Sequence, residues 1–297
     1  MFDKVVVGVD GRAGGRDAIA LALQLARGPG RLVLANIYGT ATAGIPAQRT
    51  PASHAQAHHL VTAARLEHEL NCATSVRRDA EPGRGLHRLA EHQHADLLVV
   101  GSSHRAGLGR ILLGDDTLAA LHGAPCAVAI APRGYVFANP RWETIGVGDD
   151  GSPESALAME TARELARVHR AQIRTLSVVP LQSPEDCEAP PDWTDATADR
   201  VRIEQSRLDA IGDIAGEAVY GDPATELARL ARSVDLLIVG SRGQGPVGRF
   251  VNGSVSTHLS RRAACPLLVL PRRLSAAESP ASDAPSQDLR VPAGSAS

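Results

Sequence analysis

Short apolar runs alternate with helical patterns along this chain. Four runs of strand length are mainly apolar and show no alternation of polar and apolar residues: Val5 to Val9, Leu32 to Ile37, Leu97 to Val100 and Cys126 to Ile130. Runs without alternation are typical of parallel strands that are covered on both faces. Between them, apolar residues recur at helical spacing, as at Ala18, Ala22 and Leu25. The pattern predicts β-α-β-α-β-α-β-α-β, which right-handed crossovers wind into a doubly wound parallel sheet.

The chain contains one internal repeat, which sets its domain organisation. The segment DLLVVGS at 96–102 reappears as DLLIVGS at 235–241, and GVDG at 8–11 matches GDDG at 148–151. We therefore expect two copies of one domain, at 1–133 and 142–273, with a linker at 134–141. Residues 274–297 are rich in Ser, Ala, Pro and Asp, so we expect a disordered tail that folding does not require.

Composition narrows the class of protein. With 43% hydrophobic and 22% charged residues the chain is typical of a soluble globular protein. No apolar run is long enough to span a membrane and the amino terminus does not resemble a signal peptide, so we expect a cytoplasmic protein without a membrane partner. The four cysteines lie far apart and are expected to be reduced.

The charged and aromatic residues exclude further classes. A net charge of −2 and an aromatic content of 3% argue against nucleic acid as a partner. Among 31 basic residues Lys4 is the single lysine, and it lies outside any glycine loop. Walker A loops and protein kinases both require a lysine near phosphate, so both classes are excluded.

A glycine-rich segment follows the strand that ends at Val239. Residues 240–256 read GSRGQGPVGRFVNGSVS, in which Gly253 and Ser254 open an apolar helical pattern. Glycines allow the backbone to approach a polyphosphate closely, and the free N–H groups at a helix start attract anionic oxygens. The arrangement suits the binding of a triphosphate. The alternative interpretation is a glycine-rich loop with a purely structural role.

With these motifs the sequence resembles the universal stress protein family in its tandem two-domain form. Nucleotide-binding members carry G-x2-G-x9-G-[ST], matched here by Gly240, Gly243, Gly253 and Ser254. They also carry V-D-G-S, matched by residues 149–152, and a closing C-P-[VL]-L-V strand, matched by residues 265–269. The resemblance implies two Rossmann-like domains of the adenine nucleotide alpha hydrolase-like type, each with a five-stranded parallel sheet flanked by helices.

The resemblance also implies ATP as the ligand of the second domain. Asp150 and the end of the second strand near Val178 would flank the adenosine, while the loop would hold ribose and phosphates. Mg²⁺ beside the triphosphate is left open, and no other metal is expected. The implied contact residues are Asp150, Val178, Gly240, Ser241, Arg242, Gly243, Arg249, Gly253, Ser254, Val255 and Ser256.

The first copy departs from this pattern. His104 stands where the second loop glycine is expected, and Asp115 and Asp116 follow Gly114 where a serine is expected. Two carboxylates at a helix start occupy the anion site themselves and repel phosphate. Arg12 also replaces the serine of V-D-G-S. We expect a degenerate copy that is retained for packing.

Several functions remain open at this stage. We expect a nucleotide-dependent stress-response regulator with unknown protein partners and no catalytic residues. A slow ATP-hydrolysing enzyme and a nucleotide-free scaffold are the alternatives. His54, His58 and His59 lie at helical spacing, although a solvated helix face explains them better than a metal site. The resemblance implies that residues 126–130 pair with residues 265–270 in an intramolecular pseudo-dimer, and a homodimer of whole chains is left open.

Overall fold

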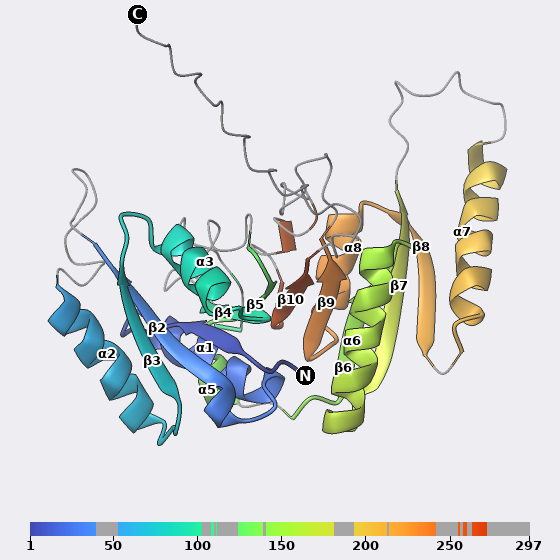
Figure 1. The fold of residues 1–297 in the computed structure, drawn as a ribbon. Coiled ribbons are helices and arrows are strands. Elements are labelled where there is room, and N and C mark those ends of the chain that lie inside the picture. Colours follow the sequence, from blue (N-terminus) through green and yellow to red (C-terminus); the bar gives the residue numbers. More distant parts are fainter. Residues whose placement is uncertain are drawn as a thin grey trace, which may run out of the picture.

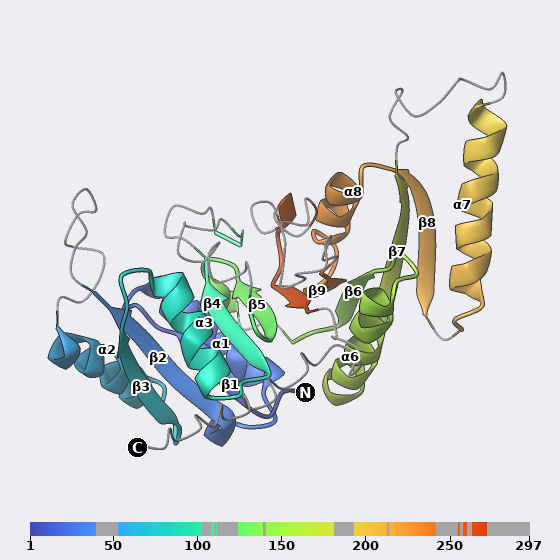
Figure 2. The same ribbon diagram turned by 45° about the horizontal axis from the view of Figure 1, so that its top comes forward.

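The computed structural model describes residues 1–39, 53–102, 108–109, 111, 124–138, 141–180, 193–212, 214–241, 255, 258–259 and 263–271. The predicted tail at 274–297 lies outside these ranges. The described strands form one ten-stranded sheet in the order β3-β2-β1-β4-β5-β10-β9-β6-β7-β8. Both halves are thus α/β units of the same topology placed side by side, as Figures 1 and 2 show.

The first half contains strands β1 to β5. Its strands are β1 (Val5–Gly8), β2 (Leu32–Tyr38), β3 (Ala73–Arg78), β4 (Leu97–Gly101) and β5 (Ala127–Ala131). Its helices are α1 (Ala13–Leu25), α2 (His54–Glu67) and α3 (Pro82–His92), with a short 3-10 turn at Pro29–Arg31. All neighbouring strands in this half are parallel, in register from Val5 beside Leu32 and Leu97.

The second half repeats this order after a short helix, α5 (Tyr135–Ala138). Its strands are β6 (Thr144–Gly148), β7 (Gln172–Pro180), β8 (Ala215–Gly221), β9 (Leu236–Gly240) and β10 (Leu267–Leu270). Its helices are α6 (Pro153–His169), α7 (Trp193–Asp209) and α8 (Pro223–Leu230). Ser152 caps α6: its side chain accepts a hydrogen bond from the Ser155 N–H, and Pro153 is the first helical residue.

The two halves meet through their last strands. β5 and β10 pair antiparallel, with Ile130 beside Leu267 and Val128 beside Val269. The two closing strands therefore cover each other's edges and leave neither one exposed. One apolar layer of buried residues, under α1, α2 and α6, runs across this junction from Val5 to Leu270, and a second lies under α3 and α8.

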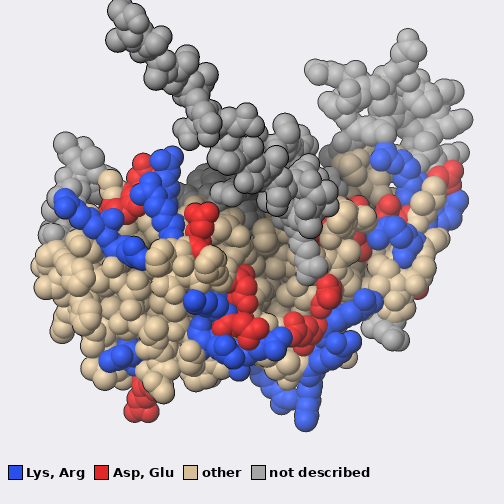
Figure 3. Space-filling view, in the orientation of Figure 1, with Lys and Arg blue, Asp and Glu red and all other residues tan. Residues whose placement is uncertain are grey.

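The described part of the predicted linker, residues 134–138 and 141, belongs to this junction. The buried carboxylate of Asp17 in α1 accepts hydrogen bonds from the N–H groups of Gly134 and Val136, at 2.9 and 3.0 Å. These bonds satisfy free N–H groups at the start of α5. On the surface, the amino terminus of Met1 and the Arg27 guanidinium both contact Glu164 of the second half. Figure 3 shows acidic and basic side chains interspersed over one face of the molecule.

Candidate functional site

The strand order reverses at β6, which lies between β9 and β7 in the second half. In doubly wound sheets, ligands bind beyond the carboxyl ends of strands at such a reversal. Residues 149–152 follow β6 here, and Ser241 follows β9. Val178 lies near the end of β7, two residues beyond the pairing of Gly148 with Leu176. The structure therefore places Asp150, Val178 and Gly240 at the carboxyl ends of three adjacent strands.

The turn after β6 is built by its own sequence. Asp150 Oδ1 accepts a hydrogen bond from the Ser152 N–H at 3.0 Å, and Gly151 has a φ of +74°. The first half forms the same turn, with Asp10 Oδ1 accepting from the Arg12 N–H at 3.0 Å. An aspartate followed by glycine favours such a turn because the carboxylate bonds the backbone two residues on. The turn leaves Asp150 exposed at the strand end.

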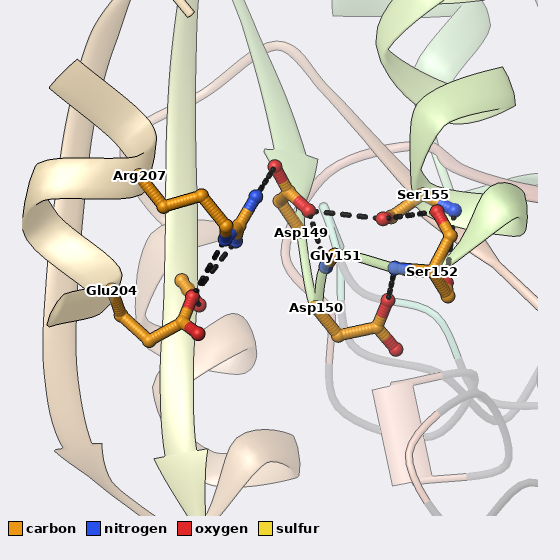
Figure 4. Close-up of polar contacts among 8 residues, drawn as sticks. Asp149, Asp150, Gly151, Ser152, Ser155, Glu204 and Arg207 are labelled. Carbon is orange, nitrogen blue, oxygen red and sulfur yellow. Dashed lines mark hydrogen bonds and ion pairs between the residues drawn. The ribbon is translucent and has the colours of Figure 1, made fainter. Parts of the chain in front are cut away.

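A cluster of ionic side chains lies behind this turn, where α6 and α7 approach the sheet (Figure 4). The Asp149 side chain is 7% exposed. Its Oδ1 accepts from the Gly151 N–H at 2.8 Å and from Ser155 Oγ at 2.9 Å. Its Oδ2 accepts from Arg207 Nη1 at 3.2 Å. One carboxylate therefore joins the turn, the first turn of α6 and helix α7.

Arg207 in turn has a second anionic partner. Arg207 Nε donates to Glu204 Oε2 at 2.9 Å, and Ser177 Oγ on β7 donates to the same oxygen at 3.1 Å. Burial of Arg207 opposes its charge, but the hydrogen bonds from the guanidinium to Asp149 and Glu204 outweigh burial and raise the pKa of Arg207. The guanidinium therefore stays charged and holds two carboxylates that would otherwise repel each other.

The glycine-loop prediction is only partly covered by the described residues. Ser241 is buried, and its N–H donates to the Leu270 carbonyl at 2.9 Å. This N–H continues the sheet and is not available to a phosphate. Val178 and Val255 are half-buried and pack against the apolar layer under α8. The remaining predicted contacts lie outside the described residues: Arg242, Gly243, Arg249, Gly253, Ser254 and Ser256.

Gly240 has a packing role that the motif did not predict. A Cβ atom at this position would lie 2.7 Å from Glu154 Cβ and 2.8 Å from the Glu154 carbonyl carbon. In the first half, a Cβ at Gly101 would lie 2.0 Å from the Gly14 carbonyl oxygen. Glycine at the end of β4 and of β9 therefore lets the start of the helix that follows the neighbouring strand, α1 or α6, approach the sheet closely. The first glycine of the motif is explained by packing, whether or not a ligand binds.

The degenerate positions of the first copy are described only in part. Gly101, Ser102 and Asp10 are described, whereas His104, Arg110, Gly114, Asp115 and Asp116 lie outside the described residues. Arg12 precedes α1 and makes no side-chain hydrogen bond as its cap, unlike Ser152 before α6. The two helix starts therefore differ as the sequence predicts.

The cysteines and histidines were weaker candidates for functional residues. Cys72, Cys126 and Cys265 are free cysteines with buried side chains, and Cys187 lies outside the described residues. His54 contacts Tyr38 edge to face and stacks on His58. In the part of the chain that the structure describes, no three His, Cys, Asp or Glu side chains gather as metal ligands would. No helix among the described residues is long and apolar enough to cross a membrane.

Comparison with known proteins identifies the family. The sequence profile of the universal stress protein family matches twice, at residues 1–132 and 141–271. The chain belongs to the universal stress protein family. A universal stress protein of Mycobacterium tuberculosis is 30% identical over 185 residues, which are 59% of this chain and 61% of that protein. A relative from Mycolicibacterium smegmatis is 27% identical over 209 residues, or 68% of this chain and 70% of that protein.

Solved structures show the same fold over most of the chain. A universal stress protein from Archaeoglobus fulgidus has a TM-score of 0.59 at 16% identity, covering 91% of this chain and 98% of that one. A protein of unknown function from Pseudomonas aeruginosa has a TM-score of 0.64 at 14% identity, covering 91% and 93%. The tandem Rossmann-like fold expected of this universal stress protein is thereby confirmed.

Sequence reasoning missed Asp149, Arg207 and Glu204 as parts of the site. A signal for Asp149 was present, because the repeat places this carboxylate where the first copy has the apolar Val9. A charged residue at a buried strand end requires a partner. Arg207 could not be identified in this way, since it lies in a helix with two other arginines, Arg200 and Arg202.

Proposed function

We propose that the second half binds one ATP per chain at the carboxyl ends of β6, β7 and β9, and that the protein acts in the cytoplasm as a nucleotide-dependent stress-response regulator. The observation that supports this proposal best is the position of the glycine motif. It begins at Gly240, on the strand next to the reversal, beside the turn that presents Asp150. A ligand site is expected at this position of a doubly wound sheet.

The described residues fit an adenosine better than they fit the phosphates. Asp150 supplies an exposed carboxylate at the strand end, and Val178 supplies a half-buried apolar side chain on the neighbouring strand. A carboxylate can accept hydrogen bonds from ribose hydroxyl groups, and an apolar side chain can contact the base. The N–H groups that would hold the phosphates must come from residues 242–256, because the Ser241 N–H is bonded to Leu270. Mg²⁺ would be held by the triphosphate, with Asp150 as a candidate partner.

The first half should not bind the nucleotide. His104 replaces the second loop glycine, and Asp115 replaces the serine that matches Ser254. The carboxylate would stand where the phosphate is expected and would repel it. One site per chain follows from this difference between two otherwise similar halves.

Two measurements test the proposal together. Heat-denatured protein should release adenine nucleotide or, if purified empty, should bind ATP in calorimetry with one site per chain. Gly243→Glu places an anion against the phosphates and should abolish this binding. His104→Glu makes the corresponding change in the first half and should leave affinity and stoichiometry unchanged.

The other outcomes point to other functions. Two equivalent sites, or full affinity in Gly243→Glu, would contradict the asymmetry. A folded protein that neither retains nor binds nucleotide would be a scaffold. Conversion of ATP to ADP or AMP during the titration would indicate an enzyme.

A further inference from the structure

The same place in the two halves holds chemically different pairs of residues. Asp149 and Val9 occupy equivalent positions, because their N–H groups bond the carbonyls of Leu176 and Ala35 in the same way. Over the turn glycine, a Cβ at Gly151 would lie 3.7 Å from Arg207 Nε and Cζ, and a Cβ at Gly11 would lie 2.6 Å from a terminal methyl of Leu60. An apolar Val9 and Leu60 in one half are therefore replaced by an ion pair in the other.

Replacing these apolar residues with an ion pair is not expected to raise the stability of the fold. The pair joins a buried carboxylate to a guanidinium that is 33% exposed. A buried carboxylate loses solvation on folding, and apolar residues of similar volume are often equally or more stabilising. The first half shows that this fold accepts apolar residues here, with Val9 buried and Leu60 against the turn. Stability alone therefore does not explain the ion pair, and the question is what the carboxylate does that a valine cannot.

The contacts of Asp149 answer this question. Its Oδ1 accepts from the Gly151 N–H at 2.8 Å, so the carboxylate holds the turn that presents Asp150. The same oxygen holds Ser155 in the first turn of α6, and Oδ2 is held by Arg207 of α7. Glu204, itself bonded by Ser177 of β7, fixes the other side of the guanidinium. Valine has no acceptor for the Gly151 N–H.

We propose that Asp149 and Arg207 are positioning residues, which hold the turn after β6 in the geometry that nucleotide binding requires. For its effect on binding this inference rests on the proposed function. It gives a reason why the ion pair occurs only in the half with the intact glycine motif. A turn that is already ordered loses less conformational entropy when a ligand binds. Because Arg207 lies on α7 and Asp149 bonds the turn, the ion pair also couples the position of α7 to that of Asp150.

The test replaces the pair with the residues of the first half. Asp149→Val combined with Arg207→Leu leaves no charge unpaired, apart from the half-exposed Glu204. The matched control is Arg202→Leu, which removes an exposed arginine of the same helix that pairs with Asp199. Three quantities are measured on each full-length protein: the melting temperature, hydrogen exchange of the segment 148–155 without nucleotide, and the dissociation constant for ATP.

The double variant should melt close to the wild type while the segment 148–155 exchanges faster. Its ATP affinity should fall about tenfold, because the turn must be ordered on binding. Arg202→Leu should change none of the three quantities. If the double variant has wild-type exchange in this segment, the pair does not hold the turn and the inference is wrong. Faster exchange with unchanged ATP affinity would also overturn it, because the turn would not matter for binding.

Failure of the proposed function gives a different result. A wild-type protein that binds no ATP, while the double variant still exchanges faster at 148–155, contradicts the proposed nucleotide site and supports the hold on the turn. If the double variant does not fold, Arg207→Met replaces it, since methionine keeps the apolar stem and frees one side of Asp149. Exchange at 148–155 should then exceed that of Arg202→Met, and equal exchange would overturn the inference.

Discussion

Trp142 Nε1 donates a hydrogen bond to Tyr135 Oη at 2.9 Å, and this bond joins the start of the second half to the segment between the halves. Tyr135 Oη in turn donates to Gln24 Oε1 of α1 at 3.0 Å. The Trp142 side chain is fully buried, and its ring centroid lies 4.4 Å from that of His169 in α6. The connecting segment therefore holds α1 of one half against α6 of the other.

Tyr135→Phe tests this connection. The change leaves the buried Trp142 N–H without its acceptor, so the free energy of unfolding should fall by about 1–3 kcal/mol. Tyr135→Phe combined with Trp142→Phe removes both polar partners, and its loss should be smaller than the sum of the two single losses. Urea unfolding followed by circular dichroism measures all three variants. A neutral Tyr135→Phe would show that the bond contributes nothing to the junction.

The central strands could be predicted from sequence because they are covered on both faces. β1, β2, β4 and β5 begin and end within one residue of the predicted apolar runs. β3 and β8 could not be located by the same argument. They lie at the two edges of the sheet, and most of their residues are exposed or half-buried, so they carry no continuous apolar signal.

The residues of the candidate site could also be predicted only in part. Asp150 was identified because its turn depends on residues adjacent in sequence, and Gly240 because it begins the glycine motif. The close approach of Gly240 to Glu154 joins distant parts of the sequence and was not predicted. The pairing of Asp149 with Arg207 joins residues that are 58 positions apart, and no local pattern predicts it. The contact that holds the linker is likewise distant in sequence, since the Asp17 carboxylate is 117 positions from Gly134.

Gly240→Ala should destabilise the second half. The added methyl carbon would meet the backbone of Glu154 at 2.8 Å, and backbone cannot move as a flexible side chain can. We expect a loss of about 1–3 kcal/mol, as for other overpacked sites. Gly30→Ala is the control, because its nearest contact would be 3.8 Å from the Asn71 carbonyl oxygen. If the two variants melt at the same temperature, α6 can shift to accommodate the added methyl group without loss of stability.

Asp222→Ala should lower stability in a pH-dependent way. Asp222 caps α8, accepting from the Thr225 N–H at 2.8 Å and from Thr225 Oγ1 at 2.7 Å. The hydrogen bond from the Thr225 side chain, followed by that from its N–H, lowers the pKa of Asp222 below its usual value. Loss of such a cap costs about 1 kcal/mol.

The sign of the pH dependence follows from the lowered pKa. The charged cap stabilises the folded state above the unfolded pKa, and this contribution is lost as the pH falls through the folded pKa. The difference in melting temperature between the wild type and Asp222→Ala should therefore be full near pH 7 and shrink below about pH 4. Asp222→Asn, which keeps an acceptor that does not titrate, is the control. A gap that stays constant down to acidic pH would contradict the role of the charge.

Cys126 should resist alkylation in the folded protein. Burial, together with the charge of Asp96, raises the pKa of this thiol to about 12. Iodoacetamide reacts with the thiolate, of which only about one part in ten thousand is present near pH 8. Peptide mass spectrometry should find Cys126 unmodified in native protein and modified in guanidinium chloride. Rapid native labelling of Cys126 would mean that the β4–β5 region opens readily.

Bound ATP should turn over slowly. We expect ATP to persist for minutes, with hydrolysis far below the roughly 1–1,000 s⁻¹ of ordinary enzymes. Catalysis requires contacts that are stronger in the transition state and a group that positions water. Lys4 cannot contribute, because it precedes β1 in the first half, and strands β4, β5, β10 and β9 separate β1 from β6 in the sheet. Among the described residues near the turn, Arg207 is already hydrogen-bonded to Asp149 and Glu204 and is not placed to position water.

Gln244 is the closest remaining candidate for positioning water, from its place in the glycine segment. Gln244→Ala should leave the slow conversion of radiolabelled ATP unchanged, since binding of the ground state alone does not lower the barrier. Gly243→Glu, which should bind no ATP, sets the background rate. A wild-type rate above about one per second that collapses in Gln244→Ala would identify an ATPase, because a single side chain would then stabilise the transition state more than the ground state.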